Sequence, residues 1–285
     1  DHIKSNFEII SGDVRDAFQM NKVIRNCDVV FHLASLIGIP YSYDAPQSYI
    51  ETNINGTLNV LQAALDSGVS KVIHTSTSEV YGTAEFVPIS ETHPLKGQSP
   101  YSASKIAADQ LALSYYFSFD LPITICRPFN TYGPRQSLRA VIPTIILQLQ
   151  SNNLINLGDV STTRDFNYID DTVDGFISCM LNEKIVGEVI NIGSNFEISI
   201  KDTAKIISKF LNVTLNINED KNRLRPKKSE VNRLWADNQK AKEILGWQPK
   251  FSGIKGLEVG ISKTIEWYKK PENIYFYKNI HDYKI

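Results

Sequence analysis

A tyrosine and a lysine four residues apart form the clearest chemical pattern in the sequence, Tyr101-Ser102-Ala103-Ser104-Lys105. On a helix, residues at this spacing share a face, so the phenol and the ammonium would lie side by side. A free phenol has a pKa of about 10, and a neighbouring ammonium lowers that value because it favours the phenolate. Such a pair can take a proton from an alcohol while hydride leaves the same carbon. By itself, however, the spacing favours an exposed Tyr and Lys without a catalytic role.

A run of hydroxyl residues with one carboxylate forms the second pattern and directly follows an apolar run. It reads Thr75-Ser76-Thr77-Ser78-Glu79-Val80-Tyr81-Gly82. In open parallel sheets, ligands bind at the carboxyl ends of the strands, which is where this run would lie. The hydroxyls offer hydrogen bonds and the glutamate offers a base. Taken alone, the run fits a Ser/Thr-rich turn with a solvated glutamate equally well.

Short β-branched runs alternate with longer helical patterns and would position both motifs. The runs at 7–10, 28–33, 71–75 and 122–126 predict strands. Continuous apolar runs of this length are typical of strands buried on both faces of a sheet. Helical patterns cover 46–67 and 102–119, then 140–150, 172–181, 199–211 and 256–269. The alternation predicts an α/β fold with a doubly wound parallel (Rossmann-like) sheet.

The pattern also predicts two domains. We expect residues 1–135 to form a dinucleotide-binding domain, and residues 136–285 to form mainly a smaller substrate-binding lobe with segments that return to the first domain. A dinucleotide-binding sheet normally begins with a strand, a Gly-rich turn and a helix. No such turn precedes Gly12. We therefore expect that about 50 native N-terminal residues are missing from the chain, roughly the size of a strand–helix–strand unit.

Composition excludes several classes of protein. Of the 285 residues, 42% are apolar and 21% are charged, which is typical of a globular enzyme. The formal net charge of −1 favours neither nucleic acid nor an anionic membrane surface as a partner. No apolar run approaches the ~20 residues that span a bilayer, and no basic-then-apolar leader opens the chain. Cys27, Cys126 and Cys179 are widely spaced, so we expect buried free thiols, no disulfide, no metal site and a cytoplasmic location.

Both motifs belong to a series of segments that resembles the extended short-chain dehydrogenases/reductases, the group that contains sugar-nucleotide epimerases and 4,6-dehydratases. The segments follow one another in the family's order and span nearly the whole chain. They lie at 12–16, 32–35, 52–57, 76–82, 101–105, 127–134, 164–168 and 235–237. Because all of them occur in that order, we expect the chain to belong to this group.

Within the group, the resemblance implies a 4,6-dehydratase, because Glu79 stands where epimerases usually carry a small or hydroxyl residue. In a dehydratase, oxidation at C4 makes the C5 hydrogen acidic, a carboxylate removes it, and water leaves from C6. By resemblance, Thr77 hydrogen-bonds the C4 oxygen, Tyr101 deprotonates it, Lys105 tunes Tyr101, and Glu79 is the C5 base. Ser78 stands where glucose-type enzymes carry the acid that protonates the leaving hydroxyl, so the identity of the general acid stays open.

The resemblance also implies NAD as the cofactor and assigns residues to it. Asp13 and Val14 would lie along the adenine, although Asp13 could instead cap the following helix. Leu33, Ala34 and Ser35 would pass beneath the pyrophosphate and ribose, although Ala34 could instead belong to the core. The remaining cofactor positions are Asn53, Thr75, Ser76, Tyr101, Lys105 and Pro128. We interpret His32 as a core histidine with satisfied hydrogen bonds rather than as a metal ligand.

The implied substrate is a nucleotide sugar. Asn130, Arg164 and Arg225 match positions that contact its diphosphate or ribose, and arginine suits this role because its planar fork pairs phosphate oxygens. Arg135 and Arg139 are further candidates, and Arg139 fits a surface ion pair equally well.

The segments 34–43, 95–100 and 191–199 look like the N-acetylglucosamine 4,6-dehydratases of legionaminic-acid pathways, which use UDP- or GDP-linked N-acetylglucosamine. A C4 epimerase acting on a UDP-hexose and a non-catalytic dinucleotide-binding protein are the alternatives. Relatives commonly pair through helices that correspond to 46–67 and 102–119, so a homodimer is expected, with no nucleic-acid or membrane partner.

Overall fold

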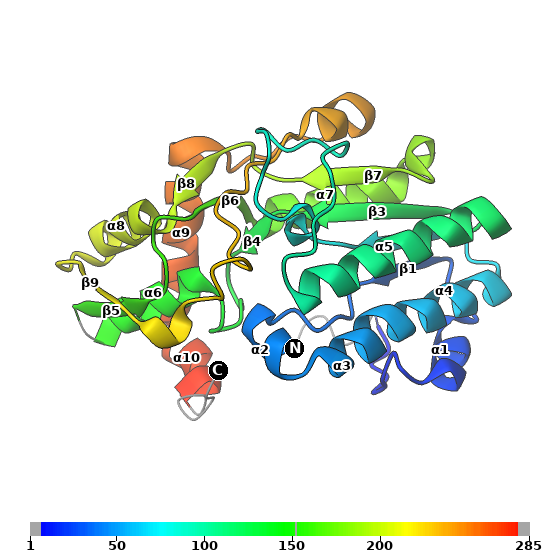
Figure 1. Cartoon of the computed structure of the whole chain (residues 1–285), viewed down its shortest axis with the longest axis horizontal. Coiled ribbons are helices and arrows are strands. Elements are labelled where there is room, and N and C mark those ends of the chain that lie inside the picture. Colours follow the sequence, from blue (N-terminus) through cyan, green and yellow to red (C-terminus); the bar gives the residue numbers. More distant parts are fainter. Residues whose placement is uncertain (1–6, 152, 279–285) are drawn as a thin grey trace.

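A four-stranded parallel sheet forms the centre of the protein, in the order β1-β2-β3-β7 (Figure 1). The computed structural model describes residues 7–151 and 153–278 of the chain. The four strands are β1 (Val29–His32), β2 (Lys71–Thr75), β3 (Ile123–Pro128) and β7 (Val189–Ile192). Parallel neighbours need a crossover connection, and helices supply each one here.

Both faces of this sheet are buried at β2 and β3, whereas Phe31 of β1 is exposed. Successive strand residues point to opposite faces, so Val72 packs toward α4 (Gly56–Ser67) and α5 (Pro100–Phe119), whereas Ile73 packs toward α7 (Ile169–Leu181). Neither side chain is exposed to solvent. This burial on two faces explains the continuous apolar runs of the sequence, and it confirms the doubly wound parallel sheet.

The helical pattern at 46–67 is not one regular helix. It comprises α3 (Pro46–Tyr49), a π-helical turn (Ile50–Asn55) and α4, and it follows α2 (Ile39–Asp44). π-Turns within helices occur frequently at functional sites. Here the turn carries Asn53, whose side chain points into the protein and is 1% exposed. Gly68 ends α4 in the left-handed conformation, with φ +63°.

Helix α5 begins with strong start signals. The Ser99 hydroxyl accepts a hydrogen bond from Ser102 N, the Ser102 side chain accepts one from Ser99 N, and Pro100 occupies the first turn. A buried stripe then runs along the helix at a spacing of about four residues, through Tyr101, Lys105, Asp109 and Ala112. Helical periodicity therefore places both members of the Tyr–Lys motif on the face that packs against the sheet.

The later part of the chain builds a second lobe beside the first sheet (Figure 1). A small sheet in the order β4-β6-β8 uses Asn130–Tyr132, Thr163–Tyr168 and Glu197–Ser199, and β5 (Leu154–Leu157) pairs with β9 (Asn216–Glu219). The lobe's helices are α6 (Val141–Ser151), α8 (Ile200–Leu211), α9 (Gly253–Lys269) and α10 (Pro271–Lys278). Side chains of α6, α8 and α9 share one apolar core with these strands. Helix α1 (Ala17–Ile24) packs on α4 in the first lobe.

Short helical turns complete the described part of the chain. They are 3₁₀ turns at Ser78–Tyr81, Glu183–Ile185 and Lys221–Arg223, and a π turn at Ala241–Leu245.

Two sequence expectations are wrong. Residues 7–10 form no strand, because β1 is hydrogen-bonded to β2 and no strand of the described residues pairs with 7–10; Phe7, Ile9 and Ile10 are exposed. Cys27 is exposed rather than buried, since it follows the end of α1 at the surface, whereas Cys126 and Cys179 are buried, and all three are free. Among the described residues, no helix is long and apolar enough to cross a membrane, and no cluster of His, Cys, Asp or Glu could hold a metal ion.

Candidate active site

The candidate catalytic residues meet at the carboxyl end of β2. Thr77 caps the 3₁₀ turn that carries Glu79: its hydroxyl accepts a hydrogen bond from Glu79 N at 3.2 Å. Glu79 is 8% exposed and Tyr101 is 6% exposed. The phenol of Tyr101 interacts with the Thr77 hydroxyl and with the Glu79 charge. A buried carboxylate and a buried phenol therefore share one site, with the hydroxyl between their segments.

The structure corrects one expectation about Tyr101. Burial raises the pKa of its phenol, and the charge of Glu79 adds to the rise, while the hydrogen bond with Thr77 opposes it. The predicted lowering by Lys105 is not seen, because the Lys105 ammonium donates to the carbonyl oxygen of Thr75 at 2.6 Å. Tyr101 is therefore a protonated phenol at neutral pH.

Lys105 is a buried ammonium with few neighbours to stabilise its charge. Burial lowers its pKa to about 8, and the Asp109 carboxylate one helical turn further along α5 opposes that lowering. The charge of Lys105 is therefore sensitive to its surroundings near neutral pH.

Asn53 holds a loop beside these residues. Its Oδ1 accepts hydrogen bonds from the Ser35 hydroxyl at 2.9 Å and from Leu36 N at 2.8 Å. Its Nδ2 donates to the Leu36 carbonyl and to the Ser104 hydroxyl, which belongs to α5. Asn53 thus ties the loop after β1 to the helix that carries Tyr101 and Lys105.

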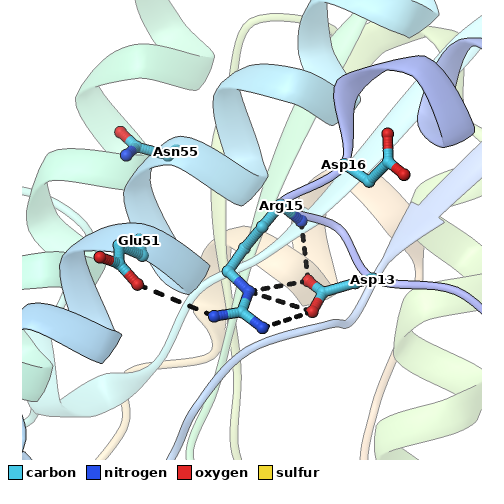
Figure 2. Close-up of a pocket in the computed structure, with 5 residues that line it drawn as sticks. All are labelled: Asp13, Arg15, Asp16, Glu51 and Asn55. Atoms are coloured by element: carbon cyan, nitrogen blue, oxygen red, sulfur yellow. Dashed lines mark hydrogen bonds and ion pairs between the residues drawn. The ribbon is translucent and has the colours of Figure 1, made fainter.

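A shallow depression of about 410 Å³ is lined by Asp13, Arg15, Asp16, Glu51 and Asn55 (Figure 2). Arg15 lies between Asp13 and Glu51 there, with its Nη2 at 2.6 Å from Asp13 and its Nη1 at 3.7 Å from Glu51. The bonds from Arg15 lower the pKa of Asp13 to about 2. Asp16, rather than Asp13, caps α1, so the capping interpretation of Asp13 is wrong.

Most of the other predicted cofactor residues lie at the carboxyl ends of β1, β2 and β3, whereas Val14 precedes α1. Leu33 and Ala34 are exposed directly after β1, so the core interpretation of Ala34 is wrong. The Thr75 hydroxyl oxygen is buried without a hydrogen-bond partner. Val14 packs against Gly56, Ser76 donates to Asp109, and Pro128 ends β3. His32 is buried and bonds the Thr57 hydroxyl, as expected for a core histidine.

Predicted substrate residues of the second lobe approach the same site. Arg164 is 6% exposed, lies 3.4 Å from Glu230, and interacts with the charge of Glu79. Arg225 Nη1 lies 3.6 Å from the same Glu230 carboxylate and makes no hydrogen bond. Asn130 Oδ1 is also buried without a partner. Arg164 therefore links the second lobe to the candidate base.

Two further arginine candidates lie at the surface. Arg135 and Arg139 are both exposed. Arg139 lies beside Gly38 and the Tyr49 hydroxyl, close to the loop that follows β1.

Sequence reasoning missed three residues of the site. Glu230 sits between Arg164 and Arg225, Tyr49 packs against Tyr101, and Asp109 lies beneath Lys105. The spacing of Asp109, four residues after Lys105, was a usable signal. No sequence signal points to Tyr49 or Glu230, because only tertiary packing brings these residues from distant segments to the site.

Comparison with known proteins identifies the class. The family model described as GDP-mannose 4,6 dehydratase matches residues 1–259. The chain is 33% identical to the dTDP-D-glucose 4,6-dehydratase of Mus musculus, over 97% of this chain and 77% of the relative. It is 36% identical to a UDP-N-acetyl-alpha-D-glucosaminuronate decarboxylase of Bacillus cytotoxicus, over 96% of this chain and 86% of the relative.

A solved structure agrees with this result. The UDP-glucuronic acid 4-epimerase of Bacillus cereus, in complex with UDP-glucuronic acid and NAD, superposes with a TM-score of 0.86 at 32% identity, covering 94% of this chain and 84% of that one. The fold and site thus define an NAD-dependent enzyme that modifies nucleotide sugars. The chain belongs to the sugar-nucleotide dehydratase and epimerase family of the short-chain dehydrogenases/reductases.

Proposed function

We propose that the chain is a sugar-nucleotide 4,6-dehydratase. The observation that carries this proposal is Glu79, a buried carboxylate whose charge acts on the Tyr101 phenol at the carboxyl end of β2. A C4 epimerase moves only hydride and a proton at C4, so it has no use for a base at this place. A dehydratase needs such a base to remove the C5 hydrogen.

The described residues fit NAD. The exposed Leu33 and Ala34 directly follow β1, and the unpartnered Thr75 hydroxyl oxygen ends β2, at the strand ends where a dinucleotide binds. The depression beside Asp13 offers a further polar surface for the cofactor. Bound NAD supplies a hydride acceptor for C4 and later a hydride donor for C6. Its positive nicotinamide ring would also favour the Tyr101 phenolate, opposing the effect of burial.

The side chains then have separate tasks. Thr77 hydrogen-bonds the C4 oxygen, and Tyr101 takes the C4 hydroxyl proton while hydride leaves C4. Glu79 removes the C5 proton once C4 is a ketone, and water leaves from C6. Ser78 sits in the same 3₁₀ turn, 2% exposed, so it can orient the leaving hydroxyl but is a weak acid.

The second lobe would hold the diphosphate. Arg164 and Arg225 both face Glu230, and Arg225 Nη1 makes no hydrogen bond. A diphosphate would satisfy both guanidinium groups. In this proposal, residues 1–135 bind NAD and residues 136–285 bind mainly the nucleotide sugar.

We propose UDP- or GDP-linked N-acetylglucosamine as the substrate, as in legionaminic-acid pathways. The sequence resemblance of 34–43, 95–100 and 191–199 supports this, and so does the relative named for an N-acetylated glucosaminuronate linked to UDP. A C4 epimerase is the second candidate, because an epimerase structure is among the similar ones.

One assay separates these functions. The protein is incubated with NAD and either UDP- or GDP-N-acetylglucosamine, and the products are followed by alkaline absorbance and proton NMR. A dehydratase gives a 4-keto sugar with a new C6 methyl signal and, in heavy water, deuterium at C5. An epimerase gives the C4 epimer without a methyl signal. NAD binding without any product would indicate a non-catalytic protein and contradict the proposal.

We further propose a homodimer that pairs through α4 and α5. Leu58, Phe117 and Phe119 on these helices are exposed, with 39%, 75% and 53% of each residue accessible. Covering these apolar side chains in a dimer would remove apolar surface from water. A monomer mass in light scattering would contradict the dimer. The free thiols of Cys126 and Cys179 fit the reducing cytoplasm as the compartment.

A further inference from the structure

A fully buried carboxylate lies beneath the candidate catalytic lysine. Asp109 is 0% exposed, and its Oδ2 accepts hydrogen bonds from the Ser76 hydroxyl at 2.7 Å and from Arg127 Nε and Nη2 at 3.2 and 3.0 Å. Its Oδ1 lies 3.3 Å from His74 Nε2. Asp109 thus joins α5 to the end of β2 through His74 and Ser76, and to β3 through Arg127.

Lys105 and Asp109 both contact residues 74–76, where β2 ends. Lys105 donates to the carbonyl of Thr75, the last residue of β2, and Asp109 contacts the residues on either side, His74 of β2 and Ser76 directly after the strand. Three consecutive residues at the end of β2 are therefore held by one face of α5. The segment with Thr77 and Glu79 begins directly after them. A shift of Asp109 would move that segment relative to Tyr101.

We infer that Asp109 is a positioning residue of the catalytic site, which keeps Lys105 protonated during catalysis and fixes the end of β2 against α5. This inference rests on the proposed function. No step of the reaction uses Asp109 directly, since its carboxylate is enclosed by His74, Ser76 and Arg127.

The charges around Lys105 support this role. Burial lowers the Lys105 pKa to about 8, and the Asp109 charge opposes the lowering. His32 of β1 and His74 of β2 also face Lys105, and burial lowers both of their pKa values, so both imidazoles are neutral at neutral pH.

Asp109 itself remains ionised. Burial raises its pKa, but the His74 contact and the charges of Arg127 and Lys105 outweigh burial and lower it overall. Without this carboxylate, the charge that opposes the effect of burial on the Lys105 pKa would be lost. The Lys105 ammonium would then be lost at lower pH, and the charge-assisted hydrogen bond that it donates to the Thr75 carbonyl would weaken.

The direct test measures the protonation of Lys105 without substrate. The Nζ signal is followed by NMR against pH in protein carrying ¹⁵N-lysine, and a Lys105→Met variant assigns it. In Asp109→Asn, we expect the titration midpoint to fall by about one pH unit or more. Asp109→Glu keeps the charge and should restore most of the midpoint. An unchanged midpoint in Asp109→Asn would overturn the inference.

The kinetic test uses the same variants. The basic limb of kcat/KM against pH should move to lower pH in Asp109→Asn, and a one-unit shift makes kcat/KM at pH 8 fall about fourfold more than at pH 6.5. Tyr81→Phe is the matched control: it removes the Tyr81 hydroxyl that bonds Arg127 and Asn191 but keeps the Asp109 charge. A purely structural network would give equal activity losses at both pH values in both variants.

Two further outcomes are decisive. If Asp109→Asn does not fold because Arg127 is left unpaired, Asp109→Asn combined with Arg127→Gln removes both charges, and the Lys105 midpoint should still fall. If the midpoint falls but the wild-type protein makes no keto sugar, the proposed function fails while the assignment of Asp109 to the charge of Lys105 stands. Keto-sugar production together with an unchanged Lys105 midpoint would overturn the inference about Asp109 but leave the proposed function standing.

Discussion

The Tyr49 ring packs edge-on against the Tyr101 ring, with ring centres 6.2 Å apart and planes inclined at 77°. Tyr49 is 1% exposed, and its hydroxyl donates to the carbonyl oxygen of Gly38. Gly38 ends the loop that leaves β1. Tyr49 therefore connects Tyr101 to the loop that is predicted to pass beneath the NAD pyrophosphate.

We expect substitutions of Tyr49 to separate these two connections. Tyr49→Phe keeps the ring against Tyr101 and loses the bond to Gly38, so the KM for NAD should rise about three- to tenfold while kcat changes little. Tyr49→Leu also loses the ring contact, so kcat should fall as well. Steady-state kinetics with varied NAD and NAD titration by fluorescence check this. A larger kcat loss in Tyr49→Phe than in Tyr49→Leu would argue against it.

Glu79→Gln should lower the rate of keto-sugar formation about 10²- to 10⁴-fold, because the amide cannot accept the C5 proton. NAD binding should persist, since Glu79 lies in the turn after β2 and away from the depression beside Asp13. Alkaline absorbance of the product and NAD fluorescence give the two readings. Unchanged turnover would remove the dehydratase proposal.

Arg164→Ala should raise the KM for the nucleotide sugar about 10- to 100-fold and lower kcat much less, because a charge-assisted bond to phosphate is lost. Arg233→Ala is the matched control in the same lobe: Arg233 forms an ion pair with Glu197 near the surface, and such pairs contribute little. Initial rates over a range of substrate concentrations separate the two parameters. A fall in kcat with unchanged KM would mean that Arg164 acts on Glu79 instead.

Lys105→Met should stabilise the protein at neutral pH by about 1–2 kcal/mol while it abolishes turnover, because the buried ammonium carries a desolvation cost. The Lys105 pKa is lowered to about 8 from 10.5, so below pH 8 the lysine is charged in both the folded and the unfolded states. Between pH 8 and 10.5 the folded state binds fewer protons, and the wild-type protein gains stability relative to the variant as pH rises.

Denaturant unfolding at pH 7, 8, 9 and 10 checks the sign of this effect. The stability gap between Lys105→Met and the wild-type protein should narrow steadily above pH 8. A gap that widens with pH would show that the Lys105 ammonium stabilises the fold rather than costing free energy.

Local signals in the sequence predicted much of this structure. The parallel sheet follows from apolar runs at 28–33, 71–75 and 122–126, because a strand buried on both faces needs apolar side chains on both. The helix at 102–119 and the shared face of Tyr101 and Lys105 follow from helical periodicity, and the structure adds the first two residues, Pro100 and Tyr101, after the Ser99 cap. The run at 7–10 looked equally strand-like, but a strand also requires a hydrogen-bonded neighbour.

The sequence by itself determined the class of fold, because strand and helix patterns alternate along it. It also determined the shared helix face of Tyr101 and Lys105 and the carboxylate at position 79, because spacing along one helix or one turn sets these. Only the tertiary structure decided which distant side chains surround them: Tyr49 against Tyr101, Asp109 between β2 and β3, and Glu230 between two arginines. It also decided the protonation of the site, because a pKa depends on burial and on charges brought in by packing, and no local pattern encodes either.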